Sequence, residues 1–98
     1  METEFKNDDL RQLYTDLGFT GGFSVAIVKA YRKRMQLIVN ANDERDIRKI
    51  KSNHYEKLKG NRDHQHSVRL NDKMRLIFEI KPNTPKNIIV VVSIENYH

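Results

Sequence analysis

The sequence contains no cysteine and no long hydrophobic run. Without cysteine, disulfide scaffolds, thiol catalysis and cysteine-ligated zinc are excluded. The longest apolar run covers residues 88–92, whereas a membrane-spanning helix needs about 20 apolar residues. Residues 1–5 are acidic and lack the basic and apolar regions of a signal peptide. We therefore expect a cytoplasmic protein that has no membrane partner and is stabilised by packing alone.

The motifs of several enzyme classes are also missing. Two glycines at residues 21–22 precede a predicted helix, but the Lys-Ser/Thr pair of a phosphate-binding loop does not follow them. No Gly-x-Ser-x-Gly motif is present, which argues against acyl transfer. No acidic residue or cysteine follows His64 and His66 at the spacing of a zinc site. We expect neither a bound metal nor a cofactor.

Length and composition predict one small domain over residues 1–98. The chain is 38% hydrophobic and 32% charged, too apolar for a disordered tail and too polar for a membrane protein. The net charge is +5, and most of the excess lies in residues 51–98. A basic half is typical of proteins that bind polyanions, although solubility explains the same charge equally well.

The first half of the chain has the hydrophobic spacing of helices. A short strand is predicted to end at Phe5. Asn7 is the expected N-cap of the helix that follows, and Gly18 is its expected C′ residue, just beyond the helix end. A second helix is predicted over residues 24–40, and a short third one begins at residues 42–44. The apolar positions expected to face the core are Leu10, Leu13, Tyr14, Leu17, Ile27, Val28, Tyr31, Met35, Leu37, Ile38, Ile47 and Ile50.

After residue 54 the hydrophobic period changes to two, which is typical of strands. Two alternating segments, residues 66–70 and 74–80, are separated by a turn-rich loop at residues 71–73. A last strand over residues 87–94 is apolar on both faces and is expected in the middle of the sheet. The predicted architecture is α+β, with N-terminal helices packed on one face of a small, mainly antiparallel sheet.

The register of the predicted hairpin places two arginines opposite each other. A three-residue loop pairs Val68 with Leu76, so the apolar residues of both strands share one face. The same register sets Arg69 across from Arg75 on the other face, where like charges are destabilising. Either an anion such as phosphate lies between the two guanidinium groups, or Glu79 or another carboxylate neutralises one of them. The segment before the hairpin adds further positive charge through two lysines, Lys57 and Lys59.

The residue types suit cleavage of an RNA strand by its own ribose 2′-hydroxyl. That reaction needs a base for the hydroxyl, cations at the phosphate and an acid for the leaving 5′-oxygen. The terminal Tyr97 and His98 offer a stacking ring and a titratable imidazole, although the end of a chain also frays readily. Groups of the required types are Glu56, Lys59, Arg69, Arg75, Tyr97 and His98.

Three segments of the chain resemble the HigB branch of the RelE toxin superfamily: residues 58–62, residues 66–76 and residues 95–98. The resemblance implies a twisted, RelE-like (microbial-RNase-like) fold and a ribosome-dependent endoribonuclease that cleaves translated mRNA. It also implies a helix-turn-helix antitoxin of HigA type, which assembles with the toxin into a hetero-oligomer.

The resemblance further assigns roles to individual residues. Lys59 and Arg75 match the cations at the scissile phosphate, while Tyr97 matches a stacking or orienting residue. His98 matches an acid/base residue, and Glu56 stands where some members carry histidine, so either of these two serves as base and the other as acid. The residues expected to contact RNA are Lys57, Arg62, Arg69 and Asn96, the last standing where members often have aspartate.

Two other functions remain open from the sequence. A ParE-like member of the same superfamily would bind DNA gyrase without cutting RNA. A non-catalytic RNA-binding protein would show salt-dependent binding without cleavage, with Arg69 and Arg75 as docking contacts.

Overall fold

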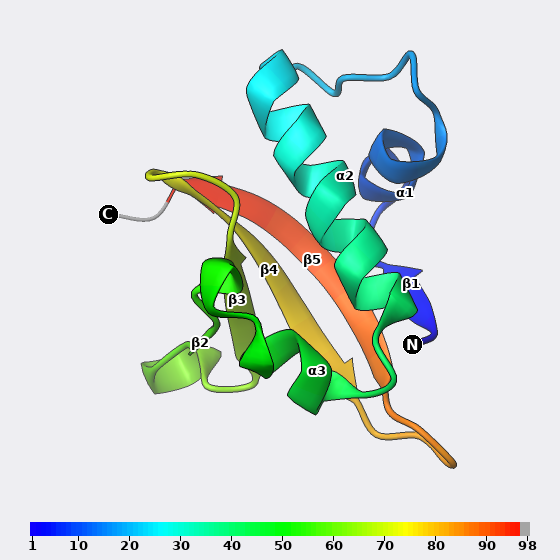
Figure 1. Cartoon of the computed structure of the whole chain (residues 1–98), viewed down its shortest axis with the longest axis vertical. Coiled ribbons are helices and arrows are strands. Elements are labelled where there is room, and N and C mark those ends of the chain that lie inside the picture. Colours follow the sequence, from blue (N-terminus) through cyan, green and yellow to red (C-terminus); the bar gives the residue numbers. More distant parts are fainter. Residues whose placement is uncertain (97–98) are drawn as a thin grey trace.

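The computed structural model describes residues 1–96, in which three helices pack on a five-stranded sheet (Figure 1). The helices are α1 (Asp8–Thr15), α2 (Val25–Asn40) and α3 (Glu44–Lys49), and the 3₁₀ turns are η1 (Lys51–Asn53) and η2 (Gly60–Arg62). The strands are β1 (Thr3–Phe5), β2 (Glu56–Lys57), β3 (Gln65–Arg69), β4 (Met74–Lys81) and β5 (Ile88–Asn96).

The strands are ordered β1-β5-β4-β3-β2. β1 runs parallel to β5, whereas the other three neighbouring pairs are antiparallel. The helices cover one face of the sheet (Figure 1). The α+β architecture is therefore confirmed. β5 is an interior strand between β1 and β4, although the middle position of the sheet belongs to β4. The sequence pattern did not locate β2, because a strand of two residues is too short to show an alternation.

Helix α1 begins where the sequence predicts, and its C-cap is Asp16, one residue before the C-cap that Gly18 as C′ residue implies. The Asn7 side chain caps it by accepting a hydrogen bond from the Leu10 amide at 3.0 Å. At the other end, the Asp16 carboxylate accepts from the Gly18 amide at 2.9 Å, a local turn that competes with the next helical turn. Leu17 consequently lies outside the helix and is 81% exposed, so the prediction that it faces the core is wrong.

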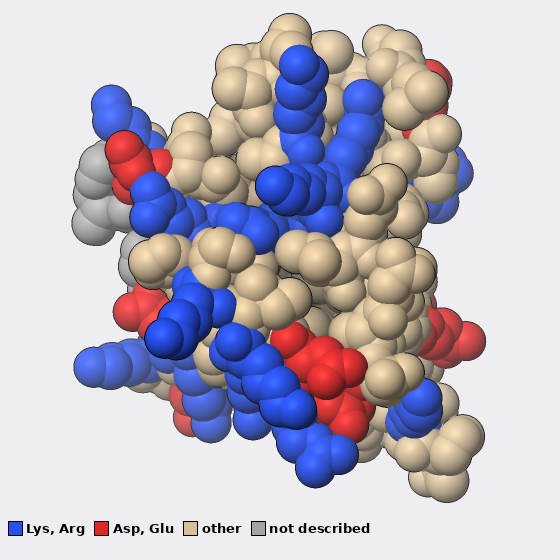
Figure 2. Space-filling view, viewed as in Figure 1, with Lys and Arg blue, Asp and Glu red and all other residues tan. Residues whose placement is uncertain are grey.

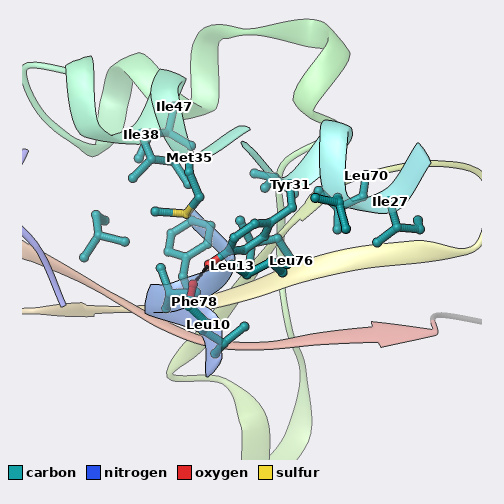
Figure 3. Packing of buried hydrophobic residues seen from close by; sticks show 14 residues of the cluster. Leu10, Leu13, Ile27, Tyr31, Met35, Ile38, Ile47, Leu70, Leu76 and Phe78 are labelled. Atoms are coloured by element: carbon teal, nitrogen blue, oxygen red, sulfur yellow. Dashed lines mark hydrogen bonds between the residues drawn. The ribbon is translucent and has the colours of Figure 1, made fainter. Parts of the chain in front are cut away.

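The hydrophobic core lies between the helices and the sheet (Figure 3). Helix α2 supplies its largest residues, and the Tyr31 hydroxyl donates to the Leu10 carbonyl at 2.7 Å, which satisfies the one polar group that this ring carries into the core. The predicted stripe of α2 is confirmed, except that Leu37 is only half-buried and lies outside this cluster. The fully buried side chains of this cluster include Leu13, Tyr31, Met35, Ile38, Ile47, Val68, Leu76, Phe78, Ile89 and Val91.

The predicted hairpin register is confirmed. Val68 pairs with Leu76 and Arg69 with Arg75, and the Leu70 amide donates to the Met74 carbonyl across the three-residue loop at 2.9 Å. Val68 and Leu76 lie in the core, so the two arginines project from the opposite face of the sheet.

An irregularity in β5 changes which of its side chains reach that opposite face. Ile77 pairs with Ser93, but the next residue, Phe78, pairs with Val91, so one residue of β5 is skipped in a β-bulge. Val91 therefore points into the core, whereas Ser93 and Glu95 point to the face of Arg75. In a regular strand these three alternate residues would all point to the same face.

The face opposite the helices is only partly open to solvent. Ser67 and Ile77 lie on this face and are both fully buried, and Leu58 is buried as well. Within residues 1–96, no helix combines the length and the apolar character needed to cross a bilayer.

Candidate functional site

The two opposed arginines have different partners. Arg69 forms an ion pair with Asp72 of the hairpin loop. Arg75 donates from Nε to the Ser67 hydroxyl at 2.8 Å and from its terminal nitrogen to the His54 carbonyl. Of the two explanations left open by the sequence, neutralisation by a carboxylate applies to Arg69. That carboxylate belongs to Asp72 and not to Glu79.

The turn η1, which precedes His54, is tied to the hairpin by another arginine. Arg34 of α2 donates from Nε to the Arg69 carbonyl at 2.9 Å and from Nη2 to the Ser52 carbonyl at 3.0 Å. His54 follows in the left-handed conformation, with φ of 44°, which histidine adopts more readily than most residues. Arg34 and Arg75 together fix the segment that leads into Glu56.

Glu56 lies on the face of Arg75. Its Cα pairs with that of Ser67, whereas Lys57 pairs with His66. Because successive side chains of a strand alternate, Glu56 shares a face with Ser67 and Arg75, and Lys57 points to the other face. Lys57 therefore does not add its charge to the arginine face. A cleft of about 340 Å³ along this edge is lined by Glu56, Lys57, Leu58, Lys59 and Arg62.

Arg62 is engaged by an acidic residue from β5. Its Nη1 and Nη2 donate to Oε1 and Oε2 of Glu95 at 3.0 and 2.8 Å, the two-pronged geometry that suits a guanidinium and a carboxylate. These hydrogen bonds lower the pKa of the Glu95 carboxyl group. Glu95 is directly opposite Arg75 in the ladder, so three charged residues of the sequence motifs meet on one face.

The end of the chain is described as far as Asn96. Its Cα pairs with that of Met74, which places the Asn96 side chain on the helix side of the sheet, one step away from the row of Arg75 and Glu95. Tyr97 and His98, to which the sequence assigns stacking and acid/base roles, lie outside the described residues.

His66 belongs to the interior. Its ring packs against Tyr55 and Phe78, with centroid distances of 5.6 and 5.5 Å, and those two rings also contact each other at 6.5 Å. The His66 Nδ1 hydrogen-bonds to the Tyr55 hydroxyl. Burial lowers the pKa of the His66 imidazole, and the nearby charges of Arg48 and Lys57 lower it further. Across residues 1–96, no group of three or more His, Cys, Asp or Glu side chains is arranged to hold a metal ion.

Basic residues also occur on the helix side. Figure 2 shows lysine and arginine side chains spread in a broken band over the face that carries α2 and α3. Some of these basic side chains bond to the protein's own backbone. Arg32 donates to the carbonyls of Leu13, Asp16 and Phe19 and so caps the end of α1.

Comparison with known proteins identifies the family. A family model described as a RelE-like toxin of the type II toxin-antitoxin system HigB matches residues 3–93. The chain belongs to the HigB-like toxin family. The protein is therefore the toxin of a type II toxin-antitoxin system, and its family membership implies an antitoxin partner.

Two solved structures share the fold of this HigB-like toxin. A YoeB/ParE toxin from Agrobacterium tumefaciens has a TM-score of 0.63 at 16% identity, with 100% of both chains covered. A YoeB dimer from Staphylococcus aureus has a TM-score of 0.58 at 21% identity, covering 100% of this chain and 97% of that one. These similarities show a RelE-like α+β fold. No curated protein sequence matches the chain.

Several residues of this region of the HigB-like toxin were not predicted as functional. Ser67 carries a sequence signal, because it stands in the Ser-x-Arg part of the hairpin motif. Arg34 and His54 carry none, since they reach the site from α2 and a turn. Glu95 stands in the motif segment at residues 95–98, but no role was predicted for it. Only the folded chain brings them together.

Proposed function

We propose that this HigB-like toxin is a ribosome-dependent endoribonuclease that acts in the cytoplasm, cleaves translated mRNA and so inhibits translation. One observation carries the proposal. Glu56 and Arg75 share a face on either side of Ser67, whose hydroxyl accepts from the Arg75 guanidinium. A carboxylate beside a fixed cation is the minimum needed for a base next to a phosphate.

The proposed reaction is a metal-free transesterification. A base takes the proton of the ribose 2′-hydroxyl, the 2′-oxygen attacks phosphorus, and the bond from phosphorus to the 5′-oxygen breaks. An acid protonates that oxygen, leaving a 2′,3′-cyclic phosphate and a 5′-hydroxyl. Glu56 and His98 are proposed as the base and acid, in either assignment.

The remaining residues are proposed to bind and orient the RNA. Lys59 and Arg75 stabilise the negative charge that builds on the phosphate, and Tyr97 stacks on or orients a base. Arg75 is suited to this role because Ser67 and the His54 carbonyl hold its guanidinium in one place. Arg69 is proposed to contact the flanking RNA from the face of Arg75. Lys57 and Asn96 point to the helix side and are proposed to contact RNA only where it extends beyond that face.

The antitoxin is proposed to be a helix-turn-helix protein of HigA type that assembles with the toxin into a hetero-oligomer. A gene for such a protein directly beside the toxin gene would support this partner. Co-expression of that protein would be expected to relieve the growth arrest caused by the toxin alone.

The test is mRNA cleavage on translating ribosomes, with cut sites mapped by primer extension. Arg75→Ala is expected to lower the cleavage rate by about 10²–10³-fold. Arg11→Ala is a matched control, because Arg11 is an exposed arginine on α1, on the helix side of the sheet. Equal cleavage by the wild type, Arg75→Ala and Arg11→Ala would contradict the proposal.

Two further outcomes would replace the proposed function. Absence of RNA cleavage together with inhibited DNA supercoiling would identify a gyrase-directed toxin. Salt-sensitive RNA binding without cleavage would identify a non-catalytic RNA-binding protein.

A further inference from the structure

Arg62 makes a long-range ion pair that crosses the sheet. It lies in η2, directly after the edge strand β2, whereas its partner Glu95 lies on β5, with β4 and β3 between them. The loop must therefore fold back over the face opposite the helices. Ser67 and Ile77 of the intervening strands are fully buried on that face, which agrees with a chain segment held close to it.

The guanidinium of Arg62 is held from two sides. Its Nε donates to Gln65 Oε1 at 2.9 Å, and Gln65 Nε2 donates in turn to Glu79 Oε2 at 3.1 Å. On the other side, the Ser93 hydroxyl donates to Glu95 Oε2 at 2.6 Å. Because a guanidinium is planar and its donors have fixed directions, these contacts define its orientation as well as its position.

Lys59 belongs to the same turn as Arg62. The Arg62 amide donates to the Lys59 carbonyl at 3.3 Å, and Gly60 between them has a φ of +68°, a conformation that favours glycine. A tether at Arg62 therefore restricts the backbone of Lys59, the cation proposed to act at the phosphate.

The ion pair with Arg62 also determines where the Glu95 carboxylate lies. It lies directly opposite Arg75 in the β4–β5 ladder, and both of its carboxylate oxygens are occupied by Arg62. Without Arg62, the positively charged side chain that the strand pairing places closest to this carboxylate is Arg75. A carboxylate on Arg75 would compete with a phosphate for the same guanidinium.

From these contacts we infer that Arg62 is a positioning residue acting through Glu95, and that it does not bind RNA as its sequence motif suggests. The ion pair fixes the Lys59 turn to the end of β5 and holds the Glu95 carboxylate away from Arg75. For its effect on cleavage, this role rests on the proposed ribonuclease function.

A double-mutant cycle distinguishes positioning from RNA contact. Arg62→Gln is expected to lower single-turnover cleavage by about tenfold, because it frees the turn and leaves an unpaired carboxylate opposite Arg75. Glu95→Gln is expected to lower it less. The double variant Arg62→Gln/Glu95→Gln is expected to match Glu95→Gln, because in both proteins the turn is untethered and no carboxylate remains opposite Arg75. If the double variant is instead as impaired as Arg62→Gln while Glu95→Gln cleaves like wild type, Arg62 contacts RNA and the inference is overturned.

Amide hydrogen exchange tests the tether without RNA. Exchange of residues 59–64 is expected to be faster in both single variants and in the double variant than in wild type. Arg11→Gln, which breaks an exposed ion pair with Asp8 on α1, is the matched control and is expected to leave this segment unchanged. Unaltered exchange in Arg62→Gln would overturn the inference. Faster exchange with no cleavage by any protein, wild type included, would support the tether and refute only the ribonuclease function.

Discussion

Glu95 lies directly opposite Arg75 in the β4–β5 ladder, yet its carboxylate binds Arg62 from the turn beyond β2. The bulge in β5 makes this possible, because it brings Glu95 to the face opposite the helices. A regular β5 with Val91 in the core would have directed Glu95 to the helix side. One skipped residue thus determines which charges meet around Arg75.

The Ser67 hydroxyl is expected to matter for cleavage more than for stability. Ser67→Ala removes the acceptor of Arg75 Nε, so the guanidinium loses one of the contacts that orient it. We expect cleavage on ribosomes to fall by about tenfold, with the midpoint of urea unfolding changed little. Thr15→Ala, which removes an exposed hydroxyl at the end of α1, should leave both measurements unchanged. A Ser67→Ala protein that cleaves at the wild-type rate would show that this contact does not orient Arg75.

Arg34 is expected to stabilise the fold. Arg34→Met keeps most of the aliphatic stem but removes the donors to the Arg69 and Ser52 carbonyls. We expect the free energy of unfolding, measured in urea, to fall by about 1–3 kcal/mol. The neighbouring Lys33→Met is the control, since Lys33 is exposed on the same helix and its replacement should change the value by less than about 0.5 kcal/mol. Equal effects of the two substitutions would contradict a structural role for Arg34.

His66 is expected to make stability depend on pH. Burial lowers the pKa of its imidazole, as do Arg48 and Lys57, while Glu44 opposes them. The unfolded chain therefore takes up the proton more readily, so the free energy of unfolding should decrease as pH falls below about 6.5. The decrease should continue until the lower, folded-state pKa is passed.

Urea unfolding at several values between about pH 5 and pH 7 measures this dependence. His66→Phe should flatten the curve in that range, because no group at this position then titrates. A curve of unchanged slope in His66→Phe would rule out His66 as the source.

Much of the fold could be predicted because its signals are local. Asn7 caps α1, the α2 stripe is buried, and the loop at residues 71–73 sets the Arg69–Arg75 register, each from residues a few positions apart. Leu17 was predicted wrongly because its apolar side chain continues the helical spacing. The Asp16 turn that ends α1 depends on one side chain competing for a backbone amide.

The sequence by itself therefore determined the α+β class, the helix-facing core and the pair of arginines on one hairpin, because hydrophobic period and loop length are short-range properties. Only the tertiary structure decided the partners of those arginines and of Arg62. Asp72, Ser67, the His54 carbonyl and Glu95 are selected by a bulge, a left-handed turn and a loop that returns across the sheet. Contacts of this kind join residues up to 33 positions apart, and no spacing in the sequence records them.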